Sequence, residues 1–296
     1  MPTYPYETLD VFTDKPFGGN QLAVFTDARG LTSEQMQSLA AEMNYSETTF
    51  VLPPDDPADD ARVRIFTRTA EMPFAGHPNV GTAFVLARHG RDRGGVLRFE
   101  EIAGLVRVEV VRDASGAVTG ATIAAPQPLT RSIELPAEAI AACAGLSPSD
   151  IVVTNHRPVR ASVGVFFVLA EVTLEALSRA TPDLSHFRAV RDKTPELEGR
   201  FSLFLYARDG VADIRARMFA PISGTWEDPA TGSASATVAA LLLSLDHRSE
   251  ARFTLTQGVE MGRPSLLHLT ARRGEDGIRA TVGGACVPMF RGEALL

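Results

Sequence analysis

Apolar residues recur along the chain at two spacings: every second residue, which predicts strands, and every third or fourth residue, which predicts helices. Together they predict many strands with a few helices between them. Segments rich in β-branched and aromatic residues end at turn residues, which is typical of strands. The predicted strands are 6–12, 21–25, 48–52, 62–68, 96–111 (a pair), 121–125, 162–169, 201–207, 213–219, 252–256, 266–271 and 278–282. Helices are predicted from Thr32 to about Asn44, from about Pro78, over 136–144 and 173–180, and in the apolar run 237–243.

Local signals set some of these limits. Gln35 follows Thr32 by three residues, so the two form a capping box at the start of the first helix. Glu47 then falls at the junction between this helix and the next strand, where a side chain can point into a cleft. The polar segment 188–200 contains a proline and reads as a surface loop or a mobile flap.

Two stretches, 71–83 and 227–243, change abruptly from a polar loop to an apolar helix. In the first, Gly76 permits close approach of the backbone and Pro78 suits a first helical turn. The second has Gly232 at the corresponding place. A helix start offers unpaired N–H groups and a positive dipole end, so both stretches predict a place for a small carboxylate.

A strand with an Arg-x-Arg pattern precedes each of these loops, at 62–66 and at 215–219. The repetition predicts an internal duplication into two similar α+β lobes, with one loop-to-helix turn of each facing a shared cleft. The chain is expected to pass between them at the proline-rich break 126–128. We therefore expect an N-terminal lobe over 1–125 and a C-terminal lobe over 126–277. The tail 278–296 is a candidate to return to the first lobe.

Composition agrees with a globular protein of this size. The chain has 296 residues, 45% hydrophobic and 22% charged, which is enough for two domains with their own cores. Its formal net charge of −7 and the absence of a Lys/Arg block argue against a nucleic-acid partner. The N-terminus has no secretion signal, and no run of about 18 apolar residues is present to span a bilayer. We expect a cytoplasmic protein that does not bind membranes.

The chemistry is narrowed by the motifs that the sequence lacks. There is no Cys-x-x-Cys, no His-x-x-x-His, no dinucleotide fingerprint and no P-loop. The two cysteines, Cys143 and Cys286, form neither a disulfide framework nor a metal cluster. Proton transfer by side chains alone remains, so we expect no metal and no cofactor. Glu47 is a candidate acid–base, since one carboxyl can take a proton and return it. On the residues alone, a solvent-exposed glutamate at a strand edge is the stronger reading.

Five separated motifs carry a resemblance. They are 10–13 with 16–24, 44–51, 75–78, 227–234 and 257–265, and they resemble the PhzF phenazine-biosynthesis-like isomerase family in content and order. The resemblance implies a diaminopimelate-epimerase-like fold of two similar α+β lobes. Each lobe is expected to be a mostly antiparallel sheet wrapped around a central helix, with the active site in the cleft between them. It also favours the catalytic reading of Glu47, which matches the family's catalytic glutamate. Members are commonly homodimers, and we expect one here.

The other candidate site residues lie at the two loops. His77 would hold the substrate or shuttle the proton, and an unperturbed pKa near 6.5 would suit either role. Asp228 would accept a hydrogen bond from a substrate amine or hydroxyl or orient His77, or it is only a turn residue before Pro229. Gly76, Gly232 and Ser233 would supply backbone and hydroxyl donors to a substrate carboxylate.

The resulting functional hypothesis is a cofactor-independent isomerase of a small amino or hydroxy carboxylic acid. The best-known activity of the family isomerises trans-2,3-dihydro-3-hydroxyanthranilate, with the glutamate moving a proton from C3 to C1. Related epimerases use one cysteine at each loop, whereas these loops carry Gly76-His77 and Gly232-Ser233, which disfavours two-thiol racemisation. Two alternatives stay open. One is an epimerase or dehydratase at the same site, and the other is a non-catalytic protein that binds small molecules.

Overall fold

The computed structural model describes all residues from Met1 to Leu296, and the chain divides into two compact units. The first unit comprises Met1–Ala124 and Val282–Leu296, and the second comprises Ala125–Thr281. The fold is a mixed α/β fold, rich in strands and with few helices. No helix is long and apolar enough to cross a bilayer.

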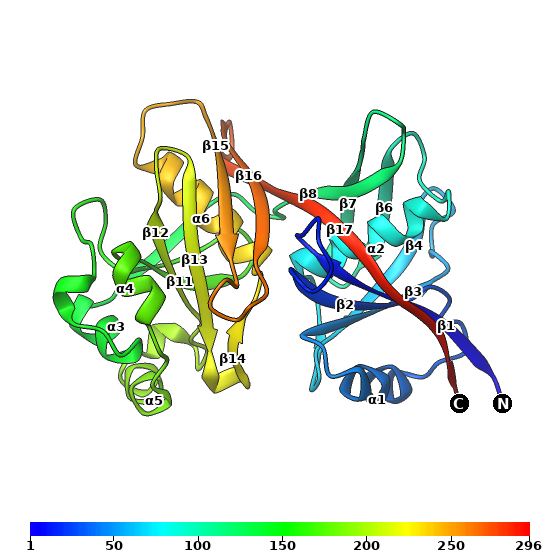
Figure 1. Cartoon of the computed structure of the whole chain (residues 1–296), viewed down its shortest axis with the longest axis horizontal. Helices are drawn as coiled ribbons and strands as arrows, with labels where there is room; N and C mark the ends of the chain where they lie inside the picture. Colours follow the sequence, from blue (N-terminus) through cyan, green and yellow to red (C-terminus); the bar gives the residue numbers. More distant parts are fainter. The chain divides into compact units, whose positions relative to one another are not determined.

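The first unit is a ring of strands around one helix (Figure 1). Its strands pair in the order β1-β2-β3-β4-β6-β7-β8-β17, and β17 pairs with β1 again, so the ring closes. The strands are β1 Thr3–Val11, β2 Asn20–Phe25, β3 Glu47–Leu52, β4 Ala61–Phe66, β5 Glu71–Met72, β6 Val96–Glu101, β7 Gly104–Arg112, β8 Val118–Ala124 and the later part of β17 Gly277–Leu295. The helices are α1 Ser33–Met43 and α2 Gly76–Arg88.

The two helices of this unit differ in burial for reasons visible in the sequence. Twelve of the thirteen residues of α2 are buried, because almost every position is small or apolar. Helix α1 lies outside the strands (Figure 1) and buries only one side, with Met36 and Ala40 inside. The capping box predicted at its start is confirmed: Thr32 Oγ1 accepts from the Gln35 amide at 3.2 Å, and Gln35 Oε1 accepts from the Thr32 amide at 2.9 Å.

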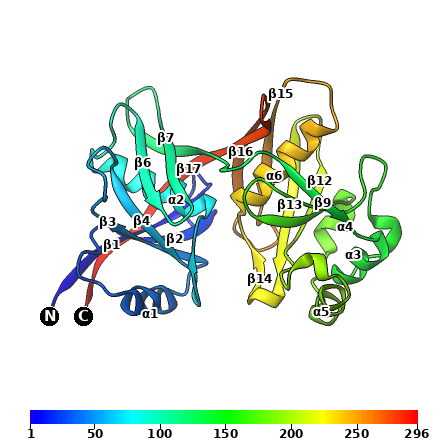
Figure 2. The same cartoon turned by 180° about the vertical axis from the view of Figure 1, so that it is seen from behind.

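The second unit repeats this arrangement. Its strands are β9 Thr130–Glu134, β10 Val159–Ser162, β11 Phe166–Glu171, β12 Leu203–Arg208, β13 Asp213–Ala220, β14 Thr225–Asp228, β15 Glu250–Gln257, β16 Ser265–Gly274 and the start of β17. Its helices are α3 Ala137–Cys143, α4 Leu174–Arg179, α5 Leu184–Lys193 and α6 Gly232–Ser244, with 3₁₀ turns η1 Pro148–Asp150, η2 Pro195–Leu197 and η3 Pro221–Ser223. In Figure 2, α6 lies against the strands away from α3, α4 and α5.

The strand pairing has the same order in both units. In the first, β1–β2, β3–β4 and β6–β7 are antiparallel, whereas β2–β3 and β4–β6 are parallel. In the second, β10–β11, β12–β13 and β15–β16 are antiparallel, whereas β11–β12 and β13–β15 are parallel. Helices α2 and α6 each follow a short strand that pairs back on β4 or β13. The two units therefore share one order of strands and helices.

Two sequence predictions are wrong. The single strand predicted over 162–169 is a hairpin, in which β10 ends at Ser162 and β11 starts at Phe166. Gly164 turns the chain with a φ of +150°, and the apolar valines on both sides hid the turn in a continuous hydrophobic run. The loop or flap predicted over 188–200 contains the second half of α5, where Phe187 is the one buried residue. Leu184, Phe187 and Val190 do recur at helical spacing, but the predicted loop began at residue 188 and so separated Val190 from the two apolar residues before it.

Packing around α2 leads to a testable prediction at Gly81. A Cβ atom there would lie 2.5 Å from Leu22 Cδ2 and 2.9 Å from Val11 Cγ2, both in the buried core. An open helical site would gain about 1 kcal/mol from Gly→Ala. Here we expect Gly81→Ala to lower the free energy of unfolding by about 1–3 kcal/mol through overpacking. Urea denaturation measures the difference, and a stabilised variant would contradict this account of the packing.

Candidate functional site

The start of α2 brings two of the predicted site residues together. Glu47 is the first residue of β3, and His77 is the second residue of α2. His77 Nδ1 lies 3.3 Å from Glu47 Oε2, with the side chains 5% and 19% exposed. Strand β2 completes the group, because Leu22 pairs with Glu47 and the preceding residue, Gln21, places its carbonyl oxygen 3.3 Å from His77 Nε2.

These contacts determine where protons can reside. The Gln21 carbonyl oxygen can only accept, so His77 Nε2 carries a hydrogen and donates it. In a neutral imidazole, Nδ1 then has only a lone pair, and it faces a carboxyl oxygen. A hydrogen bond between Nδ1 and Oε2 therefore requires one further proton, shared by Glu47 and His77. With this proton the pair is an acid, and without it Glu47 is a base.

The protonation of His77 differs from the sequence expectation. Burial lowers the pKa of His77 to about 3, and the hydrogen bond to the Gln21 carbonyl only partly opposes this shift. The expectation of an unperturbed pKa near 6.5 is therefore wrong, because the sequence does not show that the start of α2 is enclosed. At neutral pH the imidazole is uncharged, so it serves Glu47 as a hydrogen-bond acceptor.

The second unit holds the remaining predicted residues around the start of α6. Asp228 ends β14, is buried, and accepts a hydrogen bond from Thr231 Oγ1 at 2.5 Å. The wholly buried Gln257 fastens the same turn: its Nε2 donates to the Asp228 carbonyl at 2.7 Å, and its Oε1 accepts from the Thr231 amide at 3.0 Å. Asp228, Thr231 and Gln257 are therefore joined by hydrogen bonds at the turn that leads into α6.

Gly76, Gly232 and Ser233 lie at the first positions of the two central helices. Neither α2 nor α6 has a side-chain cap on its N-terminal residue, which is Ala75 in one and Thr231 in the other. In contrast, α1, α4 and α5 are capped by Thr32, Thr173 and Asp183. An uncapped first turn leaves backbone N–H groups and the positive end of the dipole to an anion.

Two supporting residues were missed by sequence reasoning. Asn79, wholly buried in the first turn of α2, donates through Nδ2 to the Ala75 carbonyl at 3.0 Å. Glu101, at the end of β6, interacts with Asn79, and burial raises the pKa of Glu101 to about 8. The first turn of α2 therefore packs near a carboxyl whose charged form burial disfavours. Nothing in the local sequence distinguishes Glu101 from Glu100, whereas Gln257 at least lies inside a motif used for the resemblance.

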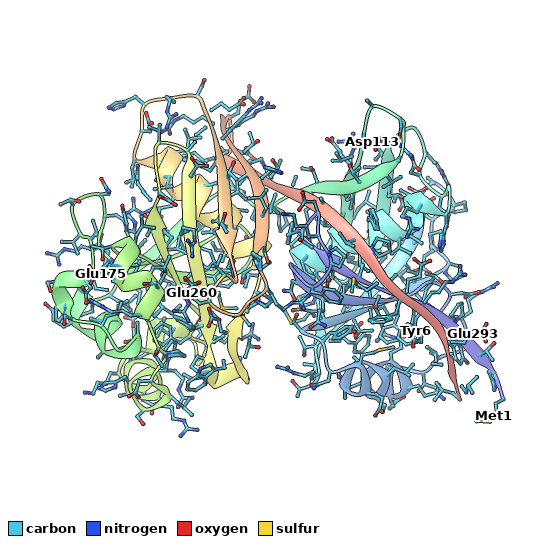
Figure 3. The ribbon with its side chains drawn as sticks, in the orientation of Figure 1. Met1, Tyr6, Asp113, Glu175, Glu260 and Glu293 are labelled. Carbon is cyan, nitrogen blue, oxygen red and sulfur yellow. The ribbon has the colours of Figure 1, made fainter.

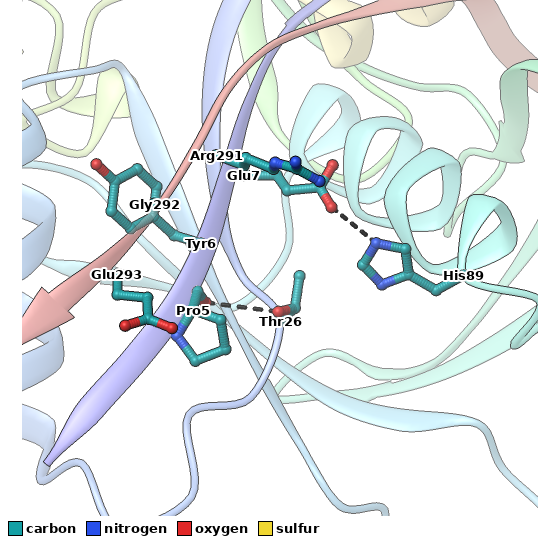
Figure 4. Close-up of a pocket in the computed structure, with 8 residues that line it drawn as sticks. All are labelled: Pro5, Tyr6, Glu7, Thr26, His89, Arg291, Gly292 and Glu293. Atoms are coloured by element: carbon teal, nitrogen blue, oxygen red, sulfur yellow. Dashed lines mark hydrogen bonds and ion pairs between the residues drawn. The ribbon is translucent and has the colours of Figure 1, made fainter.

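A separate pocket of about 400 Å³ lies on the first unit (Figure 4). It is formed by β1, β17 and nearby loops, with Tyr6 and Glu293 near the chain ends (Figure 3), and it contains none of the predicted site residues. Within it, His89 Nε2 lies 2.7 Å from Glu7 Oε1. Its histidine is 42% exposed, whereas His77 is 5% exposed, so this pocket is not the candidate site.

The two thiols lie in the interior. Cys143 and Cys286 are buried and free, and burial raises the pKa of Cys143 to about 12 and that of Cys286 further. Both are therefore protonated at neutral pH, and neither is a thiolate base. No group of three or more His, Cys, Asp or Glu side chains is arranged to hold a metal ion.

The buried state of His77 leads to a titration prediction. Between pH 3 and 6.5 the unfolded chain binds a proton at this residue and the folded chain does not. The contribution of His77 to stability is therefore present above pH 6.5 and is lost as the pH falls toward 3. In ¹⁵N NMR we expect the His77 ring signals, assigned by their loss in His77→Asn, to stay constant from pH 8 to 5. A midpoint near 6.5 would show that the ring is open to solvent.

Comparison with known proteins identifies the family of the chain. The family model described as phenazine biosynthesis-like protein matches residues 9–292. An uncharacterised isomerase of Mesorhizobium japonicum is 39% identical, with 100% of both chains covered. The trans-2,3-dihydro-3-hydroxyanthranilate isomerase of Pseudomonas aeruginosa is 38% identical over 98% of this chain and 99% of the relative. The crystal structure of a PhzF-family phenazine biosynthesis protein of Bacillus anthracis matches with a TM-score of 0.88 at 26% identity, covering 100% of both chains. The chain is therefore an isomerase that belongs to the phenazine biosynthesis-like PhzF family.

Proposed function

We propose that this isomerase moves a proton within a small amino or hydroxy carboxylic acid, with Glu47 as the acid–base and without a cofactor. The observation that carries the proposal is the enclosed 3.3 Å contact between Glu47 Oε2 and His77 Nδ1. A group that exists as acid and base within one site can take a proton from one carbon and return it to another.

The proposed reaction follows from these contacts. The substrate carboxylate binds the backbone N–H groups at the starts of α2 and α6, with Gly76, Gly232 and Ser233 as donors. Glu47 as carboxylate takes a proton from an activated carbon, the electron pair shifts along the conjugated system, and Glu47 returns the same proton at the far end. No atom is gained or lost and no electron is transferred. His77 holds Glu47 in place, and Asp228 accepts a hydrogen bond from the substrate amine or hydroxyl.

The names of relatives support one substrate. Three curated relatives between 35% and 38% identical are trans-2,3-dihydro-3-hydroxyanthranilate isomerases. We propose the same compound, with the proton leaving C3 and entering C1, and we propose that both half-sites serve one substrate in a cleft, as in diaminopimelate-epimerase-like folds. A homodimer belongs to this proposal, and light scattering of the purified chain measures it.

Replacement of Glu47 tests the assignment of the base. In D₂O, proton NMR of the dihydrohydroxyanthranilate with wild-type enzyme should show loss of the C3 signal and a change at C1. Glu47→Gln keeps the size of the side chain and removes the base, so we expect turnover to fall on the order of 10²- to 10⁴-fold.

The matched control is Glu42→Gln on the exposed side of α1, which should retain activity. Turnover of Glu47→Gln close to wild type, with the control also active, would remove Glu47 as the base. An inactive wild type would exclude this substrate and direct the search to other small amino and hydroxy acids. Release of water or inversion at a single carbon in the products would identify a dehydratase or an epimerase.

The cysteines give an independent test against thiol chemistry. Because both thiols are buried and protonated, we expect Cys143→Ser and Cys286→Ser to keep turnover within about 3-fold of wild type once the folded fraction is matched. Chelators should likewise have no effect. Loss of activity in a folded cysteine variant would indicate a thiol base and favour the epimerase alternative.

A further inference from the structure

The Arg-x-Arg strands that precede both site loops have a specific contact in common. In the first unit, Arg64 on β4 forms a two-pronged ion pair with Glu71 on β5, with Nε to Oε1 at 2.6 Å and Nη2 to Oε2 at 2.7 Å. The guanidinium also lies over the Phe66 ring, 5.0 Å from its centroid. The side chains of Arg64 and Glu71 are only 22% and 25% exposed, so solvent screens this pair less than a surface pair.

The second unit repeats the contact closely. Arg217 on β13 donates through Nε to Glu227 Oε1 at 2.8 Å and through Nη2 to Glu227 Oε2 at 2.9 Å. Its guanidinium lies 4.9 Å from the centroid of the Phe219 ring. This pair is buried, with side chains 8% and 11% exposed.

The pairs occupy the same place in the repeat. Glu71 lies five residues before Gly76, which starts α2, and Glu227 lies five residues before Gly232, which starts α6. The remaining nitrogen of each guanidinium reaches a different helix. Arg64 Nη1 donates to Ser33 Oγ of α1 at 3.0 Å, and Arg217 Nη1 donates to the Leu177 and Ala180 carbonyls at the end of α4 at 3.0 and 2.8 Å.

The strands held by these arginines are short. Strand β5 has two residues and β14 has four, with two registered partners each on β4 and β13. So few ladder hydrogen bonds leave a strand end free to slide or tilt. A bidentate guanidinium–carboxylate pair fixes both distance and orientation, which a lysine ammonium cannot do. This two-pronged Arg–Glu ion pair, called the fork below, therefore adds the restraint on the strand that its few ladder hydrogen bonds do not supply.

We propose that Arg64 and Arg217 are positioning residues that hold the strands entering α2 and α6, so that His77 and Asp228 keep their places. The inference rests on the proposed function for its effect on catalysis. Its structural part is independent of any substrate. Each strand also provides a matched control, because Arg62 pairs with the exposed Asp55 and Arg215 pairs with Glu260, neither of which lies on β5 or β14. Glu260 Oε2 also lies 4.0 Å from Arg217 Nε, but it makes no two-pronged pair with Arg217.

In the first unit the test compares Arg64→Lys with Arg62→Lys. Without the fork, the start of α2 loosens and water reaches His77. We expect its ¹⁵N ring signals to titrate at a higher pH in Arg64→Lys than in wild type, and not in Arg62→Lys. Turnover should fall on the order of 10- to 100-fold with a smaller change in KM, as for a base held out of place. Glu71→Gln removes the negative charge that Arg64 binds but keeps one oxygen acceptor, so it should give an intermediate change in His77 titration and turnover.

In the second unit the reporter is the Thr231 amide, which is hydrogen-bonded to buried Gln257. We expect this amide to exchange with D₂O roughly 10-fold faster or more in Arg217→Lys, about what losing one charge-assisted hydrogen bond is worth. Arg215→Lys should leave the rate unchanged. Glu227→Gln is the second variant for the case in which Arg217→Lys does not fold.

The outcomes separate the two proposals. Unchanged His77 titration in folded Arg64→Lys and Glu71→Gln, together with unchanged Thr231 exchange in the Arg217 or Glu227 variant, would overturn the positioning role. These two readouts need no substrate, so they hold even if the proposed isomerisation fails. Changes in His77 titration in Arg62→Lys as large as those in Arg64→Lys, or changes in Thr231 exchange in Arg215→Lys as large as those in Arg217→Lys, would also overturn it. Any arginine of the strand would then have the same effect.

Discussion

The burial of α2 is the constraint on which the first unit depends. A helix enclosed by a closed ring of strands must be apolar and small on every side, and α2 meets this with Gly81 where β1 and β2 approach most closely. Apart from Thr82, whose hydroxyl lies 2.8 Å from that of Thr49, its polar side chains lie in the first and last turns. Its start carries no capping side chain, so the backbone N–H groups there depend on what binds them. The place of the site therefore follows from how the core is filled.

The same enclosure produces the proton chemistry. His77 sits in the first turn of α2 and is desolvated with it, which lowers its pKa to about 3 and keeps the ring neutral. A neutral imidazole whose Nε2 donates to Gln21 directs the lone pair of Nδ1 toward Glu47, so a proton taken up by Glu47 finds an acceptor 3.3 Å away. An exposed histidine in this position would exchange its proton with water near pH 6.5 and would not confine it to Glu47.

Sequence reasoning succeeded where the signal is local. The capping box at Thr32, a helix start near Pro78 and the place of Glu47 at a helix-to-strand junction each depend on a few neighbouring residues, and the structure starts α2 at Gly76 and β3 at Glu47. It failed where the cause is tertiary. Burial raises the pKa of Glu101 to about 8, and Gln257 hydrogen-bonds the Thr231 amide, only because the fold encloses one residue and brings the other to a turn distant in sequence. The roles proposed for Glu47, Asp228 and Ser233 in catalysis are chemical predictions that the fold alone does not test.

The repeat explains why two arginines per unit recur at one spacing. Positions i and i+2 of a strand share a face, so Arg62 and Arg64 point the same way, as do Arg215 and Arg217. Only the second arginine of each pair faces the short strand that enters the helix, and only it forms a fork. Had the pattern served charge or solubility alone, the forks would not have to coincide in partner, distance and aromatic neighbour. Their coincidence in two sequences that otherwise differ indicates a requirement common to both units. A strand too short to be fixed by its own ladder hydrogen bonds must still position the residues that lead into a buried helix.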